Sequence, residues 1–289
     1  MSTTSRPTPV LEVRGLSVSF TQYVRGLRRR TVTPVVGMDL TARAGEVTAL
    51  VGASGSGKTL LGLAVLGLLP PNASTAGEMT YEGRPLTDAV RREVVGSEVA
   101  MLPQSVSHLD PTATVRAQVG RALELAGLDA SLAGERLAER GLEESVLGLY
   151  PHELSGGMAR RVLQAMVLAA PRRLLVADEP TPGLDPGSVR RTLGELRSLA
   201  DAGTAVVLIS HDLTGVLDVA DRVVVTDHGT TLETAVPAQF ADGGAGLRHS
   251  YSRALWRAAP ANGFHLPDGD VPLVDGPRVA VGASRAVVA

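Results

Sequence analysis

The chain has 289 residues, of which 44% are hydrophobic and 20% charged, a composition that suits a globular protein and excludes a disordered one. Its formal net charge is −2, so no overall basic field favours nucleic acid as a partner. Cysteine is absent, which excludes disulfides, cysteine zinc sites and iron–sulfur clusters. The longest apolar run, Leu60–Leu69, is about half of what spans a bilayer. We therefore expect no membrane helix.

The first third of the chain predicts short strands that lead into a glycine-rich loop. Residues 1–10 are rich in Ser, Thr and Pro, and we expect them to be flexible and to carry no secretory signal. Leu16–Phe20 alternates with a period of two, as a half-buried strand does, and Met38–Ala42 follows an arginine-rich segment. Val47–Val51 is a nearly continuous apolar strand. The loop after it leads into a predicted helix at Leu60–Leu69, which a Pro-Pro pair stops.

The rest of the chain predicts helices that alternate with strands. Residues 112–150 are rich in Ala, Leu, Glu and Arg and helical in character, and another helix is predicted at Ala159–Ala170. Buried strands at Leu174–Ala177 and Ala205–Ile209 enclose a predicted helix at Pro186–Ala202. Such alternation predicts an α/β fold with a mainly parallel sheet. Beyond about residue 240 the composition shifts to Gly, Ala and Pro, which predicts an appended, looser extension.

The segment Gly52–Thr59, GASGSGKT, matches the phosphate-binding pattern GxxxxGK[ST], with a strand before it and a helix after it. Glycines let successive backbone N–H groups point at phosphate oxygens, and the helix N-terminus adds partial positive charge. Lys58 supplies a charge for the outer phosphates, and the Thr59 hydroxyl is a ligand for Mg²⁺. The residues predicted to bind the nucleotide here are Gly52, Ser54, Gly55, Ser56, Gly57, Lys58 and Thr59.

Two carboxylates end the buried strand in LLVADEP. Asp178, at the strand tip, is predicted to hold Mg²⁺ through water. Glu179 is one residue further along, where it can act on an attacking water as a general base. The alternative is an ordinary Asp-Glu turn at the surface, and the phosphate loop upstream makes the functional interpretation the better one.

The segment LSGGM, at 154–158, precedes a predicted helix. Ser155 suits its N-cap, and Gly156 and Gly157 expose N–H groups at the positive helix end. This pattern indicates a second anion site, although a capped helix with a glycine-rich entrance fits it too.

The phosphate loop, the LSGGM segment and the LLVADEP strand, in this order, resemble the nucleotide-binding subunit of an ABC transporter. The resemblance implies a P-loop NTPase core with a mainly parallel sheet, an antiparallel β subdomain and a helical subdomain. The nucleotide-binding domain would span 11–240, with the helical part at about 104–165. It also implies that two such subunits form a head-to-tail dimer, in which Ser155, Gly156 and Gly157 contact the ATP held by the other subunit.

The resemblance places four further functional residues. Gln104, in MLPQ, matches the glutamine that senses Mg²⁺ and faces the membrane partner. His211, in LISHD, matches the histidine that contacts the γ-phosphate. Asp185, in GLD, matches an aspartate of the dimer contact. Phe20 best matches the aromatic residue that stacks on adenine, and Tyr23 is the alternative.

Two segments resemble the oligopeptide, dipeptide and nickel importer branch, namely YPHELSGGM at 150–158 and HSYSRALWRAAP at 249–260. Residues 241–289 would be the C-terminal extension of that branch. The resemblance implies two transmembrane permease subunits, a second, non-identical ATPase subunit and, indirectly, a substrate-binding protein as partners, with no nucleic acid. The chain would then lie peripherally on the cytoplasmic face of the membrane.

Some features depart from the family pattern. Ala159 and Arg160 replace the usual Arg-Gln, Pro182-Gly183 precedes Leu-Asp, and the helical subdomain looks short. An ABC exporter subunit stays an alternative. Soluble DNA-repair or ribosome-acting ATPases fit poorly, because the chain lacks a coiled-coil insertion and a second nucleotide domain. The basic run Arg25–Arg30 suits a solvated hairpin loop better than a lipid contact.

Overall fold

The computed structural model describes residues 8–24, 28–168, 172–259 and 262. Residues 1–7 of the N-terminus expected to be flexible, Arg25, and positions 169–170 of the helix predicted at Ala159–Ala170 lie outside the described residues. So does most of the extension after residue 259.

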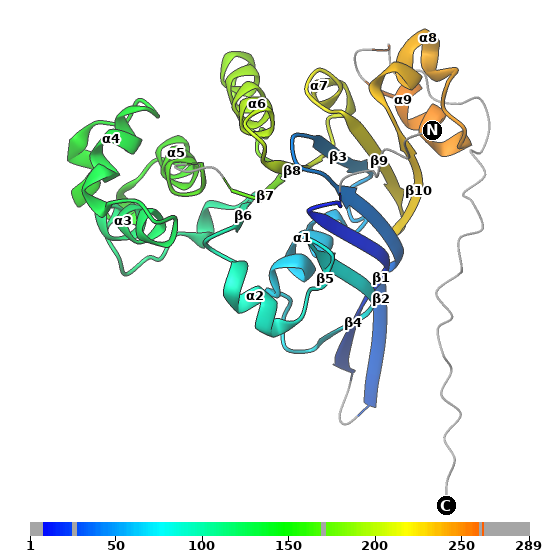
Figure 1. Cartoon of the computed structure of the whole chain (residues 1–289), viewed down its shortest axis with the longest axis horizontal. Coiled ribbons are helices and arrows are strands. Elements are labelled where there is room, and N and C mark those ends of the chain that lie inside the picture. Colours follow the sequence, from blue (N-terminus) through cyan, green and yellow to red (C-terminus); the bar gives the residue numbers. More distant parts are fainter. Residues whose placement is uncertain (1–7, 25–27, 169–171, 260–261, 263–289) are drawn as a thin grey trace, which may run out of the picture.

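A six-stranded sheet forms the centre of the molecule, with the order β10-β9-β3-β8-β7-β6 (Figure 1). Its strands are β3 (Val47–Gly52), β6 (Val99–Leu102), β7 (Leu174–Asp178), β8 (Ala205–Ser210), β9 (Arg222–Asp227) and β10 (Thr230–Ala235). All neighbours pair in parallel except β9 and β10. The predicted mainly parallel sheet is therefore confirmed. Strands β7 and β8 each end one residue later than predicted, at Asp178 and Ser210.

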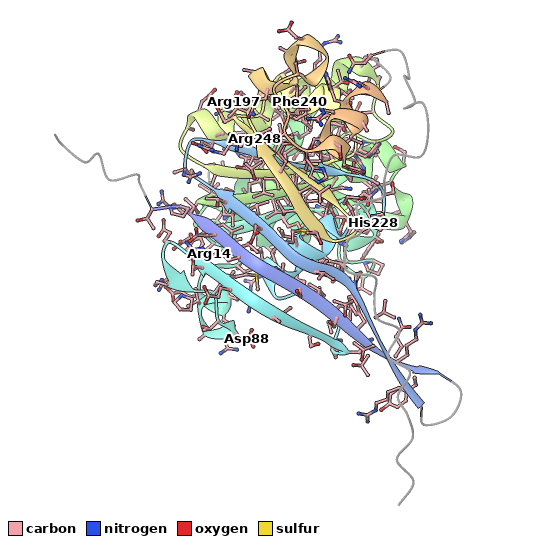
Figure 2. All side chains as sticks on the ribbon, turned by 90° about the vertical axis from the view of Figure 1, so that its right-hand side faces the viewer. Arg14, Asp88, Arg197, His228, Phe240 and Arg248 are labelled. Atoms are coloured by element: carbon pink, nitrogen blue, oxygen red, sulfur yellow. The ribbon has the colours of Figure 1, made fainter. Side chains whose placement is uncertain are left out.

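A second sheet is antiparallel, with the order β2-β1-β4-β5, and its strands are β1 (Leu11–Val24), β2 (Arg28–Ala42), β4 (Ala73–Tyr81) and β5 (Arg84–Pro85). The strands predicted at Leu16–Phe20 and Met38–Ala42 lie inside β1 and β2. The β1–β2 hairpin extends beyond the body of the molecule (Figure 2). The prediction of a loop at Arg25–Arg30 is wrong from Arg28 on, because this part pairs with the end of β1.

The helices lie around the two sheets. They are α1 (Lys58–Leu66), α2 (Asp88–Val94), α3 (Val115–Leu125), α4 (Ala133–Ala138), α5 (Gly156–Val167), α6 (Pro186–Asp201), α7 (Leu213–Leu217), α8 (Ala241–Gly244) and α9 (Ser250–Arg257). Helices α3, α4 and α5 form a group at one end of the molecule, beyond β6 (Figure 1). Helices α8 and α9 lie at the opposite end, beside β9 and β10 (Figure 1).

Two predicted helix ends are wrong, and the backbone shows why. Helix α1 ends at Leu66 and not at Leu69, because Gly67 adopts a φ of +72° and its N–H caps the Ala64 carbonyl. Helix α5 begins at Gly156 and not at Ala159, because the Ser155 hydroxyl accepts a hydrogen bond from the backbone N–H of Met158.

The parallel sheet is buried on both faces, as parallel sheets generally are. On one face, side chains such as Ala49 and Leu175 pack with α3, α5, α6 and α7. On the other face, Leu50 and Val176 pack with α1 and with the inner face of the antiparallel sheet. The phosphate loop between β3 and α1 therefore lies where the two sheets approach each other.

The turn between β9 and β10 joins the two sheets. Gly229 accepts a hydrogen bond from Val36 N–H at 2.8 Å, and Thr230 Oγ1 donates to the Val36 carbonyl at 2.7 Å. Gly229 has a φ of +79°, and a Cβ there would lie 2.2 Å from the Pro34 carbonyl oxygen. The position therefore needs glycine both for its backbone angle and for the close approach of β2.

We expect Gly229→Ala to destabilise the fold more than Gly127→Ala does. Gly127 has a similar φ of +74° but open space around it, so its variant measures the backbone cost alone. That cost is about 1–2 kcal/mol, and the clash at Gly229 adds about 1–3 kcal/mol. Urea unfolding of both variants measures the difference, and equal losses of stability would contradict the close approach.

Candidate functional site

The phosphate loop at Gly52–Thr59 closes around its own lysine. Lys58 Nζ donates to the carbonyl oxygens of Gly52 at 2.8 Å and Ala53 at 2.9 Å, and it lies 3.3 Å from Ser56 Oγ. Lys58 and Ser56 are buried, whereas the two residues between Ala53 and Ser56 are exposed. The loop thus combines a buried ammonium group with an outer rim of accessible backbone at the start of α1.

Close contacts with both sheets fix the shape of this loop. A Cβ at Gly52 would lie 2.0 Å from the carbonyl oxygen of Thr226 on β9. A Cβ at Gly57, whose φ is +85°, would lie 2.6 Å from a methyl group of Val35 on β2. The buried Thr226 hydroxyl also donates to the Val51 carbonyl at 3.0 Å. The sheets therefore dictate glycine at both positions.

Asp178 lies opposite the loop, at the end of β7. Thr59 Oγ1 donates to Asp178 Oδ1 at 3.1 Å. Burial raises the pKa of Asp178, and the hydrogen bond from Thr59 and the charge of Lys58 oppose that shift. Burial lowers the pKa of Lys58, while the charges of Glu179 and Asp178 act to raise it. The charges of Lys58 and Asp178 therefore favour each other, and they partly offset the effect of burial on both groups.

Glu179 and His211 meet at the same edge of the sheet. Glu179 Oε2 and His211 Nδ1 are 2.7 Å apart, with Glu179 buried and His211 exposed. Glu179 has a φ of +47°, a left-handed conformation that is strained for a side chain other than glycine. Its backbone N–H donates to the Ile209 carbonyl on β8 at 3.0 Å. This arrangement aims the carboxylate away from the sheet and toward the histidine.

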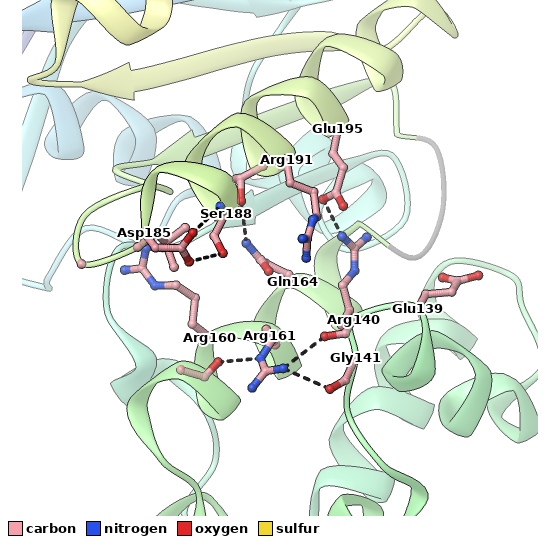
Figure 3. A pocket seen from close by; sticks show the side chains of 14 residues that line it. Glu139, Arg140, Gly141, Arg160, Arg161, Gln164, Asp185, Ser188, Arg191 and Glu195 are labelled. Carbon is pink, nitrogen blue, oxygen red and sulfur yellow. Dashed lines mark hydrogen bonds and ion pairs between the residues drawn. The ribbon is translucent and has the colours of Figure 1, made fainter.

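Ser155 and Asp185 both cap helices at the exposed side of the site. Ser155 Oγ caps α5, and Gly156 and Gly157 form the first, exposed turn of that helix. Asp185 Oδ1 accepts from the N–H groups of Gly187 and Ser188 and so caps α6. Figure 3 shows α5 and the start of α6 lining one cavity. Their role in contacting a second subunit stays a prediction.

Gln104 follows β6, and its carbonyl oxygen accepts from Arg160 on α5 at 3.1 Å. The predicted residue therefore lies at the junction between the sheet and the helical group. Its side chain is exposed, so it is accessible to a ligand or a partner. The structure places the Gln104 backbone beside α5, the helix that follows Ser155, and the sequence alone does not reveal this contact.

Phe20 is half-buried on β1, where it pairs with Val32 on β2 and packs against the core beneath the antiparallel sheet. Two residues earlier, Val18 pairs with Val35, the residue that touches the phosphate loop. Tyr23 lies three residues further out on the hairpin, 64% exposed. The register thus places Phe20 nearer the loop than Tyr23, and stacking of Phe20 on adenine stays a prediction.

Two residues that support the loop, Thr226 and Tyr251, are not predicted as site residues from the sequence. Thr226, described above, has no motif that marks it. Tyr251, on α9, has its phenol beside the Ala53 backbone and the Asp227 carboxylate, where burial first and the Asp227 charge second raise its pKa to about 12. The HSYS segment was recognised only as a family resemblance, and its contact with the loop gives it a structural role.

Comparisons with known proteins place this chain in a family. A family model described as an ABC transporter matches residues 35–182. The chain is 38% identical over 230 residues to the dipeptide transport ATP-binding protein DppD of Escherichia coli, which covers 75% of this chain and 69% of that protein. The chain belongs to the ABC transporter family. As a member of its ATP-binding proteins, it is an ATP-hydrolysing transport subunit.

Two further comparisons agree with this assignment. The chain is 36% identical over 286 residues to the peptidoglycan transport ATP-binding protein YejF of Agrobacterium fabrum, across 92% of this chain but only 50% of that protein. A solved dimeric ATP-binding cassette in a post-hydrolysis state, bound to ADP and Pi, matches with a TM-score of 0.65 at 23% identity, over 78% of this chain and 98% of that one. The latter confirms the predicted ABC ATPase fold. Within the described residues, no helix is long and apolar enough to cross a membrane.

We expect Glu179→Gln to lower ATP turnover on the order of 10²-fold or more while ATP binding persists, because a positioned general base is lost and the phosphate loop is untouched. Lys58→Ala should instead weaken ATP binding. Glu78→Gln, an exposed change on β4, serves as the control. Steady-state hydrolysis and nucleotide titration distinguish these effects. Wild-type turnover by Glu179→Gln in the assembled complex would contradict the role of Glu179.

Proposed function

We propose that this subunit powers the import of peptides. Two relatives that match most of this chain are named for dipeptide and peptidoglycan transport. The HSYSRALWRAAP segment supports the same branch, and its residues Ser250–Arg257 form α9, which contacts the phosphate loop through Tyr251. Nickel chelates, which the sequence also suggested, find no specific support in these relatives, so the proposal is restricted to peptides.

The residues at the site fit ATP with Mg²⁺. The Thr59 hydroxyl would be a hard oxygen ligand, the Asp178 carboxylate 3.1 Å from it would hold the ion through water, and Gln104 would add an amide oxygen. The described residues contain no group of three or more His, Asp or Glu side chains that could hold a metal. This suits Mg²⁺, which typically binds one or two protein oxygens together with phosphates and water. When bound, Mg²⁺ would neutralise charge on the phosphates.

The geometry supports hydrolysis by the chain's own residues. Lys58 would contact the outer phosphates as its Nζ exchanges loop carbonyls for phosphate oxygens. Glu179 would position and deprotonate the attacking water. His211, 2.7 Å from Glu179, would orient that carboxylate and contact the γ-phosphate from its exposed side. The buried Glu179 and the exposed His211 thus frame one face of the nucleotide.

A head-to-tail dimer would complete each site. Ser155, Gly156 and Gly157 are exposed at the N-terminus of α5, where backbone N–H groups favour anions. They would contact the ATP of the partner ATPase, with Asp185 at the same surface. ATP binding would close this dimer, and hydrolysis would reopen it.

An apolar groove on each ATPase subunit would receive one of the two permease subunits. It is lined by Leu63 and Leu66 of α1, Leu125 of α3 and Leu163 and Met166 of α5. Pro103, next to Gln104, also lines the groove. A helix bound there would therefore lie close to the loop that carries Gln104. A short helix on the cytoplasmic side of a permease suits such a groove. The chain would then act at the cytoplasmic face of the membrane.

We expect a peptide-loaded binding protein to stimulate ATP hydrolysis by the reconstituted complex. Closure of the dimer depends on the permeases, which the loaded binding protein engages from the opposite side of the membrane. The measurement compares peptide-loaded, nickel-chelate-loaded and empty binding protein in proteoliposomes. Stimulation by nickel chelates alone would overturn the peptide assignment. ATP turnover that no binding protein changes, together with substrate transport from the ATPase side of the membrane to the opposite side, would favour an exporter.

We further expect the second ATPase subunit to differ from this one. Importers that this chain resembles commonly pair two different ATPases, and in such a pair the Pro182-Gly183 departure would occur in only one of the two dimer contacts. A symmetric dimer is geometrically possible as well, because the chain has both a phosphate loop and the LSGGM segment. Native mass spectrometry of the complex decides between them. Two copies of this 30.0 kDa chain without another ATPase would overturn the expectation.

A further inference from the structure

One arginine connects three functional segments of this chain. Arg160 lies on α5, one turn after the signature residues Gly156 and Gly157. Its Nη1 donates to the Pro180 carbonyl at 2.7 Å, and its Nη2 donates to the Gln104 carbonyl at 3.1 Å. Figure 3 shows its side chain extending from α5 toward the start of α6.

The two carbonyl groups belong to the catalytic edge of the sheet. Gln104 follows β6, and Pro180 follows Glu179 at the end of β7. Strands β6 and β7 are neighbours in the sheet, so one planar guanidinium group reaches the loops of both. A displacement of α5 along its axis would therefore pull on the backbone beside the general base and on the backbone of Gln104.

The role needs arginine in particular. The guanidinium group is a rigid fork with donors that point in two directions, whereas a lysine ammonium group is a single point charge. The two acceptors are neutral backbone oxygens, so geometry and not charge pairing selects the side chain. Glutamine, which the family usually has here, is shorter and offers a single NH₂ group.

We propose that Arg160 is a positioning residue that couples the two ATP sites of the dimer. The signature turn at the start of α5 would act on the partner's ATP, while Gln104 and Glu179 act on the ATP of this chain. Arg160 makes these two parts of one subunit move together. This inference rests on the head-to-tail dimer of the proposed function.

The test uses the complete complex in proteoliposomes with Arg160→Gln, Arg160→Lys and Arg14→Gln. Arg14 is the matched control, because it is an exposed arginine on β1 that forms an ion pair with Glu12, away from the dimer surface. Hydrolysis is measured against ATP concentration to give kcat, KM and the Hill coefficient. ATP binding by the separate subunit and thermal unfolding are measured in parallel.

For the wild type and Arg14→Gln we expect a Hill coefficient above one, as coupled sites require. For both Arg160 variants we expect it to fall to one and kcat to fall on the order of 10-fold, because Glu179 is held less accurately. ATP binding by the separate subunit should stay unchanged, since the phosphate loop is not altered. If Arg160→Gln also unfolds at a lower temperature, Arg160→Lys, which keeps the charge and most of the side-chain length, decides.

Several outcomes would overturn the coupling role. They are a wild-type Hill coefficient of one, wild-type cooperativity and kcat in Arg160→Lys, or the same loss in Arg14→Gln. A wild-type complex that does not hydrolyse ATP at all would overturn the proposed function itself, and the coupling with it. The two failures are therefore distinguishable.

Discussion

The parallel pairing of β3, β8 and β7 is the constraint on which the site depends. In this register Val51 pairs with Ser210, and Asp178 pairs with Ile209. Three loops that start after these strands must therefore leave the sheet at one edge, as carboxyl ends of parallel strands do. The phosphate loop, Glu179 and His211 meet there although they lie far apart in the sequence. Without this register, none of the three segments forms a site.

Charge balance makes the burial of this edge tolerable. An isolated buried ammonium or carboxylate group is costly, and such groups normally persist only with partners. Lys58 donates hydrogen bonds to carbonyl oxygens of the loop, and Asp178 accepts one from Thr59. Glu179 lies within hydrogen-bond distance of His211. The strained backbone of Glu179 is held by its hydrogen bond to β8. The site is therefore preorganised for phosphate chemistry by the surrounding fold.

Parts of the chain remote from the loop contribute to its shape. The turn after β9 holds β2, and the contacts of Thr226 with Gly52 and of Val35 with Gly57 require glycine at these two positions of the loop. Tyr251, from α9, adds a contact with Ala53. Arg160 connects the helical group to the opposite end of the same edge. The phosphate loop thus contacts both sheets and helix α9 directly.

The sequence alone predicted most residues of the candidate site, because short-range patterns mark them. Lys58 and Thr59 follow from a contiguous glycine-rich pattern, Asp178 from the end of a buried apolar strand and Ser155 from its capping chemistry. Phe20 was chosen by family resemblance, and its stacking role is not yet tested. The tertiary structure alone decided what depends on long-range contact. It showed that Glu179 faces His211, that Thr226 and Tyr251 support the phosphate loop, and that Arg160 spans two strand ends. Such contacts arise from strand register and helix docking, for which a local pattern of residues carries no signal.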